Sequence, residues 1–436
     1  MKALLDLVAQ HRSGRPVGIA SICSAHPVVL DAALIDAREN GRPVLIEATS
    51  NQVNQFGGYT GMRPADFHAF VMDKADKAGL ARDLVLLGGD HLGPNAWQDE
   101  AAASAMAKAD TLIEDYVAAG FRKIHLDCSM PCVGDAPVLP DAEVAARAAR
   151  LAAVAECAWK QRGGEAPVYI VGTEVPVPGG AKEELEELQV TKPEAMAATV
   201  EAHRKAFAAL GLDEAWQRVI GIVVQPGVEF DHHDVVDFKP EKARALSAAI
   251  EQFPGLVYEA HSTDYQTPEA LAALVRGHFA ILKVGPGVTY ALRETLWALS
   301  LIEDEMLPAS KRSGLRNVVL GVMRAEPKYW NKYYADESRL TLDLQYSLSD
   351  RVRYYWAHPQ IREACEALLR NLDGLSPRGA LPQALLSQYL PRQYEDVRAG
   401  RLRNAATSLL RAGVIHVLNQ YAQACAPALP GAAGKE

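Results

Sequence analysis

The strongest constraint on this chain is a repeated alternation between short apolar runs and longer amphipathic segments. Eight runs rich in Val, Ile and Leu recur, with intervals long enough for a crossover helix each. They cover residues 17–22, 43–49, 84–90, 123–128, 168–174, 219–225, 256–261 and 279–285. The runs are continuous instead of alternating, which is typical of parallel strands buried on both faces.

The segments between these runs have the pattern of surface helices. Ala-rich amphipathic stretches cover 141–161 and 193–211, and Pro64 and Gly79 mark the start and end of another. Eight strand–helix units predict a (β/α)8 TIM barrel, an α/β fold. An open, doubly wound sheet is the alternative.

The strand pattern stops near residue 303, and helical segments such as 350–356 and 361–372 follow. We therefore predict a barrel domain over 1–302 and a helical C-terminal extension over 303–436, packed on the barrel. Aromatic residues gather in 329–334 and 345–356, and we expect them to pack against the barrel or a partner subunit.

Composition and charge exclude several classes of protein. The formal net charge of the 436 residues is −9, and Lys and Arg do not cluster as nucleic-acid binding requires. There is no uncharged apolar stretch of about 18 residues, so no membrane span is expected. Residues 1–16 predict an amphipathic helix instead of a signal peptide. Six scattered cysteines without a CxxC pair indicate reduced thiols in a cytoplasmic protein, expected to form a homo-oligomer.

Ionisable residues follow the predicted strands at their carboxyl ends, where a TIM barrel carries its active site. His91, Glu174 and His261 come after three different strands. Two imidazoles and a carboxylate suit a catalytic zinc ion with an open position, and Gln225 would complete or flank the ligand sphere. For each histidine alone, a structural role is the alternative.

Asp90 stands directly before His91, so it would move a proton on whatever the metal binds. The metal would act as a Lewis acid on a carbonyl group. Asp127 and Glu174 are the other predicted catalytic residues, and we expect Asp127 to hold the ring of His125. Lys283 offers an alternative, because a barrel lysine can form a Schiff base with a ketone.

The loops after the last two predicted strands are a frequent phosphate site in this fold. We predict that substrate, including any phosphate, is bound by residues of these loops and by Asn51 of the polar loop after the second strand. The loop residues are Ser262, Thr263, Asp264, Lys283 and Gly285. No GxxxxGK[ST] motif supports kinase chemistry, and no GxGxxG follows the first strand. The pair His232-His233 is expected on a solvated loop.

Long segments resemble one known family. They cover residues 88–97, 123–130, 171–180, 223–230, 258–266, 278–294 and 346–356. On these motifs the chain is similar to the GatZ/KbaZ family, named as the non-catalytic subunit of class II D-tagatose-1,6-bisphosphate aldolase. Some members carry the name tagatose-6-phosphate kinase, and some relatives are 4-epimerases acting on fructose 6-phosphate or free ketoses.

The family is in turn similar to zinc-dependent class II aldolases. That similarity implies proton transfer by Asp90 and metal ligation by His91, Glu174 and His261. Gln225 stands where those aldolases carry a further histidine. The resemblance implies a metal-dependent ketohexose or ketohexose-phosphate 4-epimerase. The alternative is an auxiliary subunit that supports a separate class II aldolase.

Overall fold

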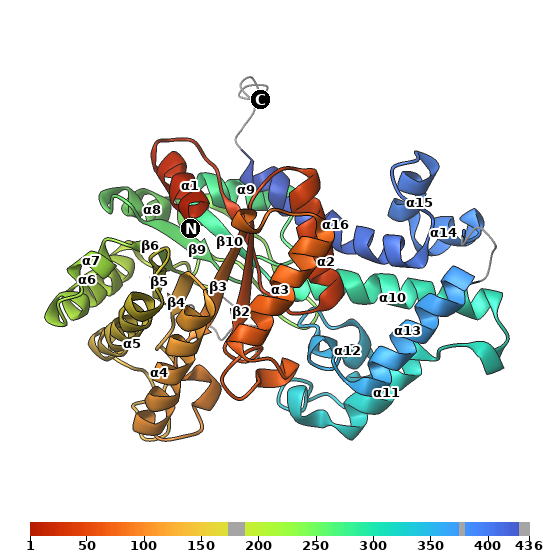
Figure 1. Cartoon of the computed structure of the whole chain (residues 1–436), viewed down its shortest axis with the longest axis horizontal. Coiled ribbons are helices and arrows are strands. Elements are labelled where there is room, and N and C mark those ends of the chain that lie inside the picture. Colours follow the sequence, from red (N-terminus) through yellow and green to blue (C-terminus); the bar gives the residue numbers. More distant parts are fainter. Residues whose placement is uncertain (173–187, 375–379, 427–436) are drawn as a thin grey trace.

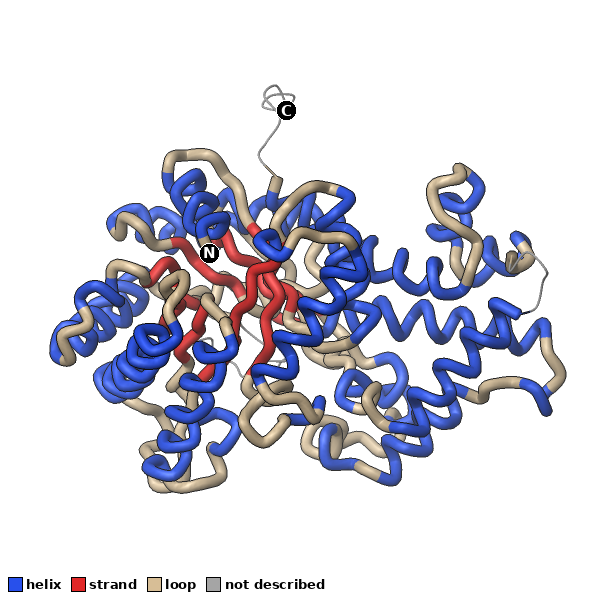
Figure 2. Tube along the Cα trace, in the orientation of Figure 1, coloured by secondary structure: helices blue, strands red, loops and turns tan. Residues whose placement is uncertain are grey.

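Eight parallel strands close into a barrel that is surrounded by helices, with the C-terminal helices extending to one side of it (Figures 1 and 2). The computed structural model describes residues 1–172, 188–374 and 380–426. The order around the barrel is β1-β10-β9-β6-β5-β4-β3-β2. Their bounds are β1 Ile19–Ile22, β2 Val44–Thr49, β3 Val85–Leu92, β4 Lys123–Leu126, β5 Val168–Gly172, β6 Val219–Val223, β9 Val257–Ala260 and β10 Phe279–Val284. Each predicted strand run contains or overlaps one of them, and the TIM barrel is confirmed.

Helices cover the outside of the barrel between consecutive strands (Figure 1). They are α2 Pro27–Glu39, α3 Pro64–Ala78, α4 Ala102–Ala119, α5 Asp141–Arg162, α6 Pro193–Ala209, the short α7 Asp213–Trp216, α8 Pro240–Ala249, α9 Pro268–Arg276 and α10 Pro286–Met306. A two-stranded hairpin, β7 Glu229–Phe230 and β8 Val235–Val236, follows β6. Gly79 ends α3 with φ +72°, the left-handed conformation that favours glycine at this position.

The amino end of the barrel is closed by α1, Lys2–Arg12. Its apolar side chains Leu4 and Val8 pack with Ile19, Leu86 and Ile281 of the barrel in one buried cluster. The predicted amphipathic helix at the start of the chain therefore exists and buries its apolar face against the barrel. The carboxyl ends of the strands are left for the site.

The C-terminal residues continue as helices beside the barrel (Figure 1). They are α11 Leu315–Ala325, α12 Leu340–Tyr346, α13 Pro359–Gly374, α14 Gln383–Tyr389, α15 Pro391–Arg398 and α16 Ala406–Cys425. Helix α10 starts at the barrel and runs through residue 302 into this region, so the division at residue 302 stays a prediction. Of the described helices, none is long and apolar enough to cross a bilayer.

The helix expected over 350–356 is wrong. Residues Arg351–Tyr354 form only a 3₁₀ turn, and Asp350 before it has φ +43°. The Asp350 carboxylate accepts hydrogen bonds from the Thr289 hydroxyl and Arg293 Nε of α10, both at 2.7 Å. These buried bonds hold the turn against α10 and outweigh its local helical pattern.

Helix α16 returns from the extension to the barrel and packs against α2, α9, α10 and β1. The Gly18 N–H donates to the Cys425 carbonyl at 3.0 Å. The Tyr421 hydroxyl donates to the Thr263 carbonyl at 2.8 Å. The last described helix thus joins the first strand and the loop after β9.

Candidate active site

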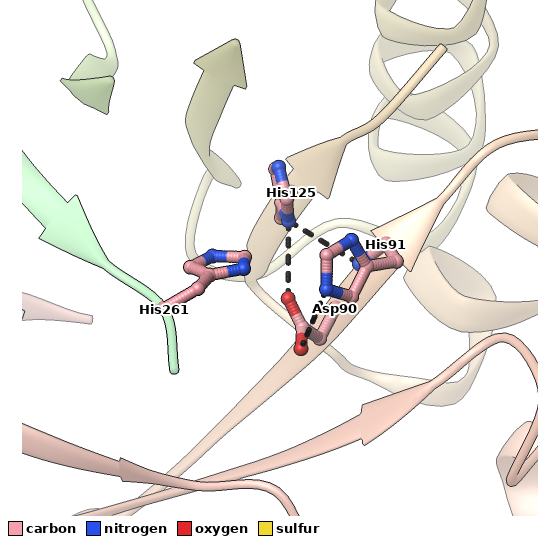
Figure 3. Close-up of side chains that lie close together, drawn as sticks. All are labelled: Asp90, His91, His125 and His261. Carbon is pink, nitrogen blue, oxygen red and sulfur yellow. Dashed lines mark hydrogen bonds and ion pairs between the residues drawn. The ribbon is translucent and has the colours of Figure 1, made fainter. Parts of the chain in front are cut away.

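Four buried side chains converge at the carboxyl ends of the strands (Figure 3). Asp90 and His91 lie on β3, His125 on β4, and His261 directly after β9. One potential ligand atom from each lies within 4.8 Å of all the others. One carboxylate and three imidazoles at this spacing fit a transition-metal ion such as zinc.

A bulge in β3 explains how two consecutive residues reach one site. The stretch from Gly89 to Leu92 on β3 faces Ile124 to Leu126 on β4, so β3 carries one extra residue. His91 takes up this irregularity with φ +48°. A bulge re-aims a side chain that would otherwise point to the opposite face of the sheet. Asp90 and His91 can therefore both face the cluster, as Figure 3 shows.

Hydrogen bonds fix the ring of His91. Its Nδ1 donates to Asp127 Oδ2 at 2.7 Å, which leaves Nε2 3.7 Å from Asp90 Oδ2. Asp127 is itself held by Ser129, whose hydroxyl donates to Oδ1 at 2.7 Å. A carboxylate behind a histidine selects the tautomer and orients the ring of a metal ligand.

The expected partner of Asp127 was wrong. His125 interacts instead with Asp90 Oδ1, 3.0 Å from its Nδ1, and its Nε2 lies 3.2 Å from the Gly172 carbonyl oxygen. The reason is the β3 bulge, which places His91 over Asp127 and turns Asp90 toward His125.

The charges of the site set its protonation. Burial raises the pKa of Asp90, but His91 and Lys283 outweigh burial and hold that pKa well below its usual value. Burial lowers the pKa of His261 to about 4, although Glu259 opposes the shift. At neutral pH the site therefore offers an ionised Asp90 and a neutral imidazole at His261, the forms that bind metals.

Below the cluster, ammonium and carboxylate groups alternate inside the barrel. Lys123 Nζ lies 2.5 Å from Glu47 and 2.6 Å from Glu259. Lys283 Nζ lies 2.5 Å from Glu47 and 2.7 Å from Asp90. All five side chains are at most 6% exposed. We call these five residues the interior charge network.

Lys283 is a charged member of this network. Burial lowers its pKa, but Asp90, Cys23 and the two glutamates raise that pKa well above its usual value. A Schiff base requires a neutral amine, so this environment disfavours the Schiff-base alternative. The ammonium of Lys283 instead keeps Asp90 ionised and in place.

A family model described as "D-tagatose-1,6-bisphosphate aldolase subunit GatZ/KbaZ-like" matches residues 4–426. The chain belongs to this GatZ/KbaZ-like family. The match confirms the family expected from the sequence motifs, and it relates the chain to tagatose-bisphosphate aldolase and carbohydrate metabolism.

A solved structure is similar over most of the chain. It is described as a probable tagatose 6-phosphate kinase from Sinorhizobium meliloti 1021. It shares 50% sequence identity with a TM-score of 0.86, over 94% of this chain and 100% of the other. Fructose-bisphosphate aldolase from Campylobacter jejuni is far more distant, at 14% identity and a TM-score of 0.44 over 85% of this chain and 92% of that one.

In this GatZ/KbaZ-like chain, a cavity of about 460 Å³ opens over the cluster. Asp90, His91 and His261 line it, together with five of the predicted substrate-binding residues: Asn51, Ser262, Asp264, Lys283 and Gly285. Thr263 is buried away from it, because its hydroxyl donates to the Lys283 carbonyl at 2.6 Å and lies 3.0 Å from the Tyr421 hydroxyl.

The phosphate donors expected at the start of α10 are already in use. Asp264 Oδ1 accepts the N–H groups of Gly285 at 2.9 Å and Gly287 at 2.7 Å. The carboxylate thus caps the helix where a phosphate would bind. Within the described part of the chain, those backbone groups are occupied by the protein itself.

Two predicted metal ligands are not in the described cluster. Glu174 lies outside the described residues. Gln225 is buried, and its Oε1 accepts the N–H groups of Gly227 at 2.7 Å and Val228 at 3.0 Å. Their roles as ligands stay predictions.

Several cavity residues were not identified from the sequence. Cys23 and Tyr59 come from loops of the barrel, and Lys332, Tyr333, Arg353 and Tyr354 come from the extension. The aromatic segments 329–334 and 345–356 were the available signal, since the sequence predicts that they pack against the barrel or a partner subunit and that they, with loop 51–61, can cover the pocket. His232, expected on a solvated loop, also contacts the extension, with Nε2 3.0 Å from the Tyr333 carbonyl oxygen.

Proposed function

We propose that this protein is a metal-dependent 4-epimerase of ketohexose phosphates of the fructose 6-phosphate and tagatose 6-phosphate type. The observation that supports this proposal is the cluster of Asp90, His91, His125 and His261, of which Asp90, His91 and His261 line one cavity. Inversion at C4, beside no activating carbonyl, requires either oxidation or reversible cleavage of the C3–C4 bond. A metal site with an adjacent base suits the cleavage route.

The metal would be held by His91 and His261, with Glu174 and Gln225 as the further predicted ligands. Imidazole and carboxylate donors favour zinc over magnesium or calcium. When bound, a divalent ion acts as a Lewis acid that polarises the ketose carbonyl. The Asp127 carboxylate, 2.7 Å from His91 Nδ1, keeps Nε2 of that ring aimed at the site.

Asp90 would move the proton. In the cleavage direction its carboxylate takes the C4 hydroxyl proton, the C3–C4 bond breaks, and its electron pair enters the ketose carbonyl to leave an enediolate and an aldehyde. The aldehyde then turns its other face to the enediolate. The C3–C4 bond forms again and Asp90 returns the proton to the new C4 hydroxyl, so that only the configuration at C4 changes.

The surroundings of Asp90 suit this role. Lys283 holds Oδ1 at 2.7 Å, so the carboxylate stays ionised and fixed at neutral pH. Aromatic side chains also line the cavity, and the ring of Tyr59 lies 4.9 Å from that of Tyr354. The reaction needs both fragments to be retained between cleavage and re-addition, which exclusion of water from the cavity would favour.

The first test is an assay of the purified protein alone, with zinc, on fructose 6-phosphate and on fructose. Tagatose products are followed by NMR, with and without EDTA. We expect metal-dependent conversion. Asp90→Asn should lower kcat at least about 100-fold, as the loss of a general base does. Exposed Asp83→Asn is the matched control and should keep full activity. Undiminished turnover in Asp90→Asn would exclude the assigned role.

The family description favours a second candidate, an auxiliary subunit of a class II tagatose-bisphosphate aldolase. In that case the protein should bind such an aldolase and raise its activity or stability. Exposed apolar side chains in the described ranges include Phe56, Leu210 and Leu342, and Leu342 shares α12 with the exposed Tyr346. Activation that persists in Asp90→Asn would support the auxiliary role.

A further inference from the structure

The extension contributes positive charge to the wall of the cavity. Lys332 and Arg353 both line the cavity that Asp90, His91 and His261 share. Both residues are more than 200 positions away from Asp90 and His91 in the sequence. They reach the site only because the extension packs over the strand ends. The cavity therefore has a metal-binding region from the barrel and a cationic region from the extension.

Neither of these two cations is held in an ion pair by the described part of the chain. Arg353 donates to the carbonyl oxygens of Ser349 and Asp350 and to the Tyr354 hydroxyl, at 2.9 Å for the last. Neither Arg353 nor Lys332 forms an ion pair with any acidic residue within 1–172, 188–374 and 380–426. A partly buried guanidinium normally has an anionic partner, because desolvating an unpaired charge is costly.

A third cation lies behind the same wall. Arg351 is 4% exposed, and its guanidinium stacks 3.2 Å from the ring centre of Tyr333, which lines the cavity. Its Nε and Nη2 have no hydrogen-bond partner among the described residues. Arg351 Nη1 also donates to the Tyr354 hydroxyl at 3.3 Å. The positive potential at this wall is therefore larger than the two lining cations alone would give.

The carboxyl group of Asp264, which also lines the cavity, is engaged by backbone groups. Asp264 Oδ1 is bonded to the backbone N–H groups of Gly285 and Gly287. Because Asp264 occupies the start of α10, an anion in the cavity cannot bind there. The cationic wall is the alternative place for it.

We propose that Lys332 and Arg353 form an anion subsite that binds the phosphate ester of the substrate, with the Tyr354 hydroxyl beside Arg353. A guanidinium matches phosphate oxygens in a bidentate manner, and an ammonium adds a second charge. The identity of the sugar rests on the proposed function, but the subsite itself predicts binding that is measurable without turnover. It assigns phosphorylated ketohexoses, and not free ketoses, as the substrate class.

The test is calorimetric titration of the zinc-loaded protein with fructose 6-phosphate, fructose and inorganic phosphate. The variants are Lys332→Met and Arg353→Met, with Arg353→Lys to restore the charge. Exposed Lys311→Met, in the same extension but not on the cavity wall, is the matched control. Melting temperatures establish that each variant is folded.

We expect each Met variant to weaken fructose 6-phosphate binding about tenfold to a hundredfold, the usual effect of losing one hydrogen bond to a charged group. Binding of inorganic phosphate should weaken as well, fructose binding should not change, and Arg353→Lys should recover part of the loss. Lys311→Met should match the native protein.

Equal affinity of the native protein for fructose and fructose 6-phosphate would overturn the subsite, and so would equal losses for both sugars in the variants. The two proposals fail separately. Charge-dependent phosphate binding without epimerisation would keep the subsite and reject the 4-epimerase. Epimerisation of fructose with no preference for the phosphate would keep the enzyme and reject the subsite.

Discussion

The interior of the barrel and the wall supplied by the extension handle buried charge in opposite ways. In the interior charge network, Lys123 lies within 2.6 Å of two glutamates, and Lys283 within 2.7 Å of Glu47 and Asp90. On the extension wall, Arg353 and its neighbour Arg351 contact carbonyl, hydroxyl and ring groups, and no described carboxylate forms an ion pair with them.

This difference separates charges that stabilise the fold from charges that are available to a ligand. In a paired network the charges neutralise one another, so removing one of them should lower the free energy of unfolding. An unpaired cation beside a cavity gains most from an incoming anion, and its loss should be seen in binding. The following four predictions test this separation, from the largest expected effect to the smallest.

Removing the central ammonium of the interior charge network should give the largest loss of stability. Lys123→Met leaves Glu47 and Glu259 buried with one ammonium fewer, so we expect the free energy of unfolding to fall by about 3–5 kcal/mol. Urea denaturation measures it. The control is Lys77→Met, which breaks the exposed Lys77–Asp73 pair and should lower the free energy of unfolding far less. Similar losses for the two variants would contradict a structural role for the network.

A buried carboxyl outside the network should respond to pH. Burial raises the pKa of Glu229 from an ordinary 4.5 to about 7. Because the folded state holds this proton more tightly, the stability it contributes is present below pH 4.5 and is lost as the pH rises through 7. Glu229→Gln cannot ionise, so its melting temperature relative to the native protein should rise between pH 5 and pH 8.

The shift from 4.5 to about 7 corresponds to roughly 3.5 kcal/mol at pH 8, since one pKa unit is about 1.4 kcal/mol. Exposed Glu241→Gln, at the start of α8, is the control and should show no such trend. A difference that stays constant with pH would mean that Glu229 is not the titrating group.

The hydrogen bond behind His91 should tune metal affinity. Asp127→Asn keeps the shape of the side chain but removes the charge that holds Nδ1 at 2.7 Å. We expect zinc affinity to fall about 10- to 100-fold, measured by competition with a chromophoric chelator. Unchanged affinity would show that His91 does not bind the metal through Nε2.

Removing the contact between the barrel loop and the extension should have the smallest effect on stability. Tyr59→Leu removes the aromatic contact with Tyr354, 4.9 Å between ring centres. Such pairs contribute about 0.5–1.5 kcal/mol, so the melting temperature should fall only slightly. Tyr346→Leu, at an exposed tyrosine of α12, is the comparison. A larger loss for Tyr346→Leu would mean that the loop does not depend on this contact.

The barrel could be predicted from the sequence because its strands are buried on both faces. That burial makes each strand a continuous apolar run, and the run over 43–49 became β2, Val44–Thr49. The meeting of Asp90, His91 and His261 also followed, since parallel strands place their carboxyl ends together. The position of the site depends here on the topology of the barrel, and the order of the apolar runs along the chain already predicts that topology.

Pairings across the barrel could not be predicted in the same way. Lys123 appears in the sequence as one polar residue at the start of a run, and only the closed barrel brings it to Glu47 and Glu259. The partner of His91 depends on one extra residue in β3, a local irregularity that no hydrophobic pattern reveals. The cations at Lys332 and Arg353 reach the site through packing between distant segments, which periodicity does not encode.

The position of α16 also bears on how the protein is made. The bond from Gly18 to Cys425 and that from Tyr421 to Thr263 connect points about 400 and 160 positions apart along the chain. A ribosome adds roughly 5–20 residues per second, so α16 is synthesised tens of seconds after β1. During synthesis the surface of β1 that α16 later contacts therefore stays uncovered for that interval.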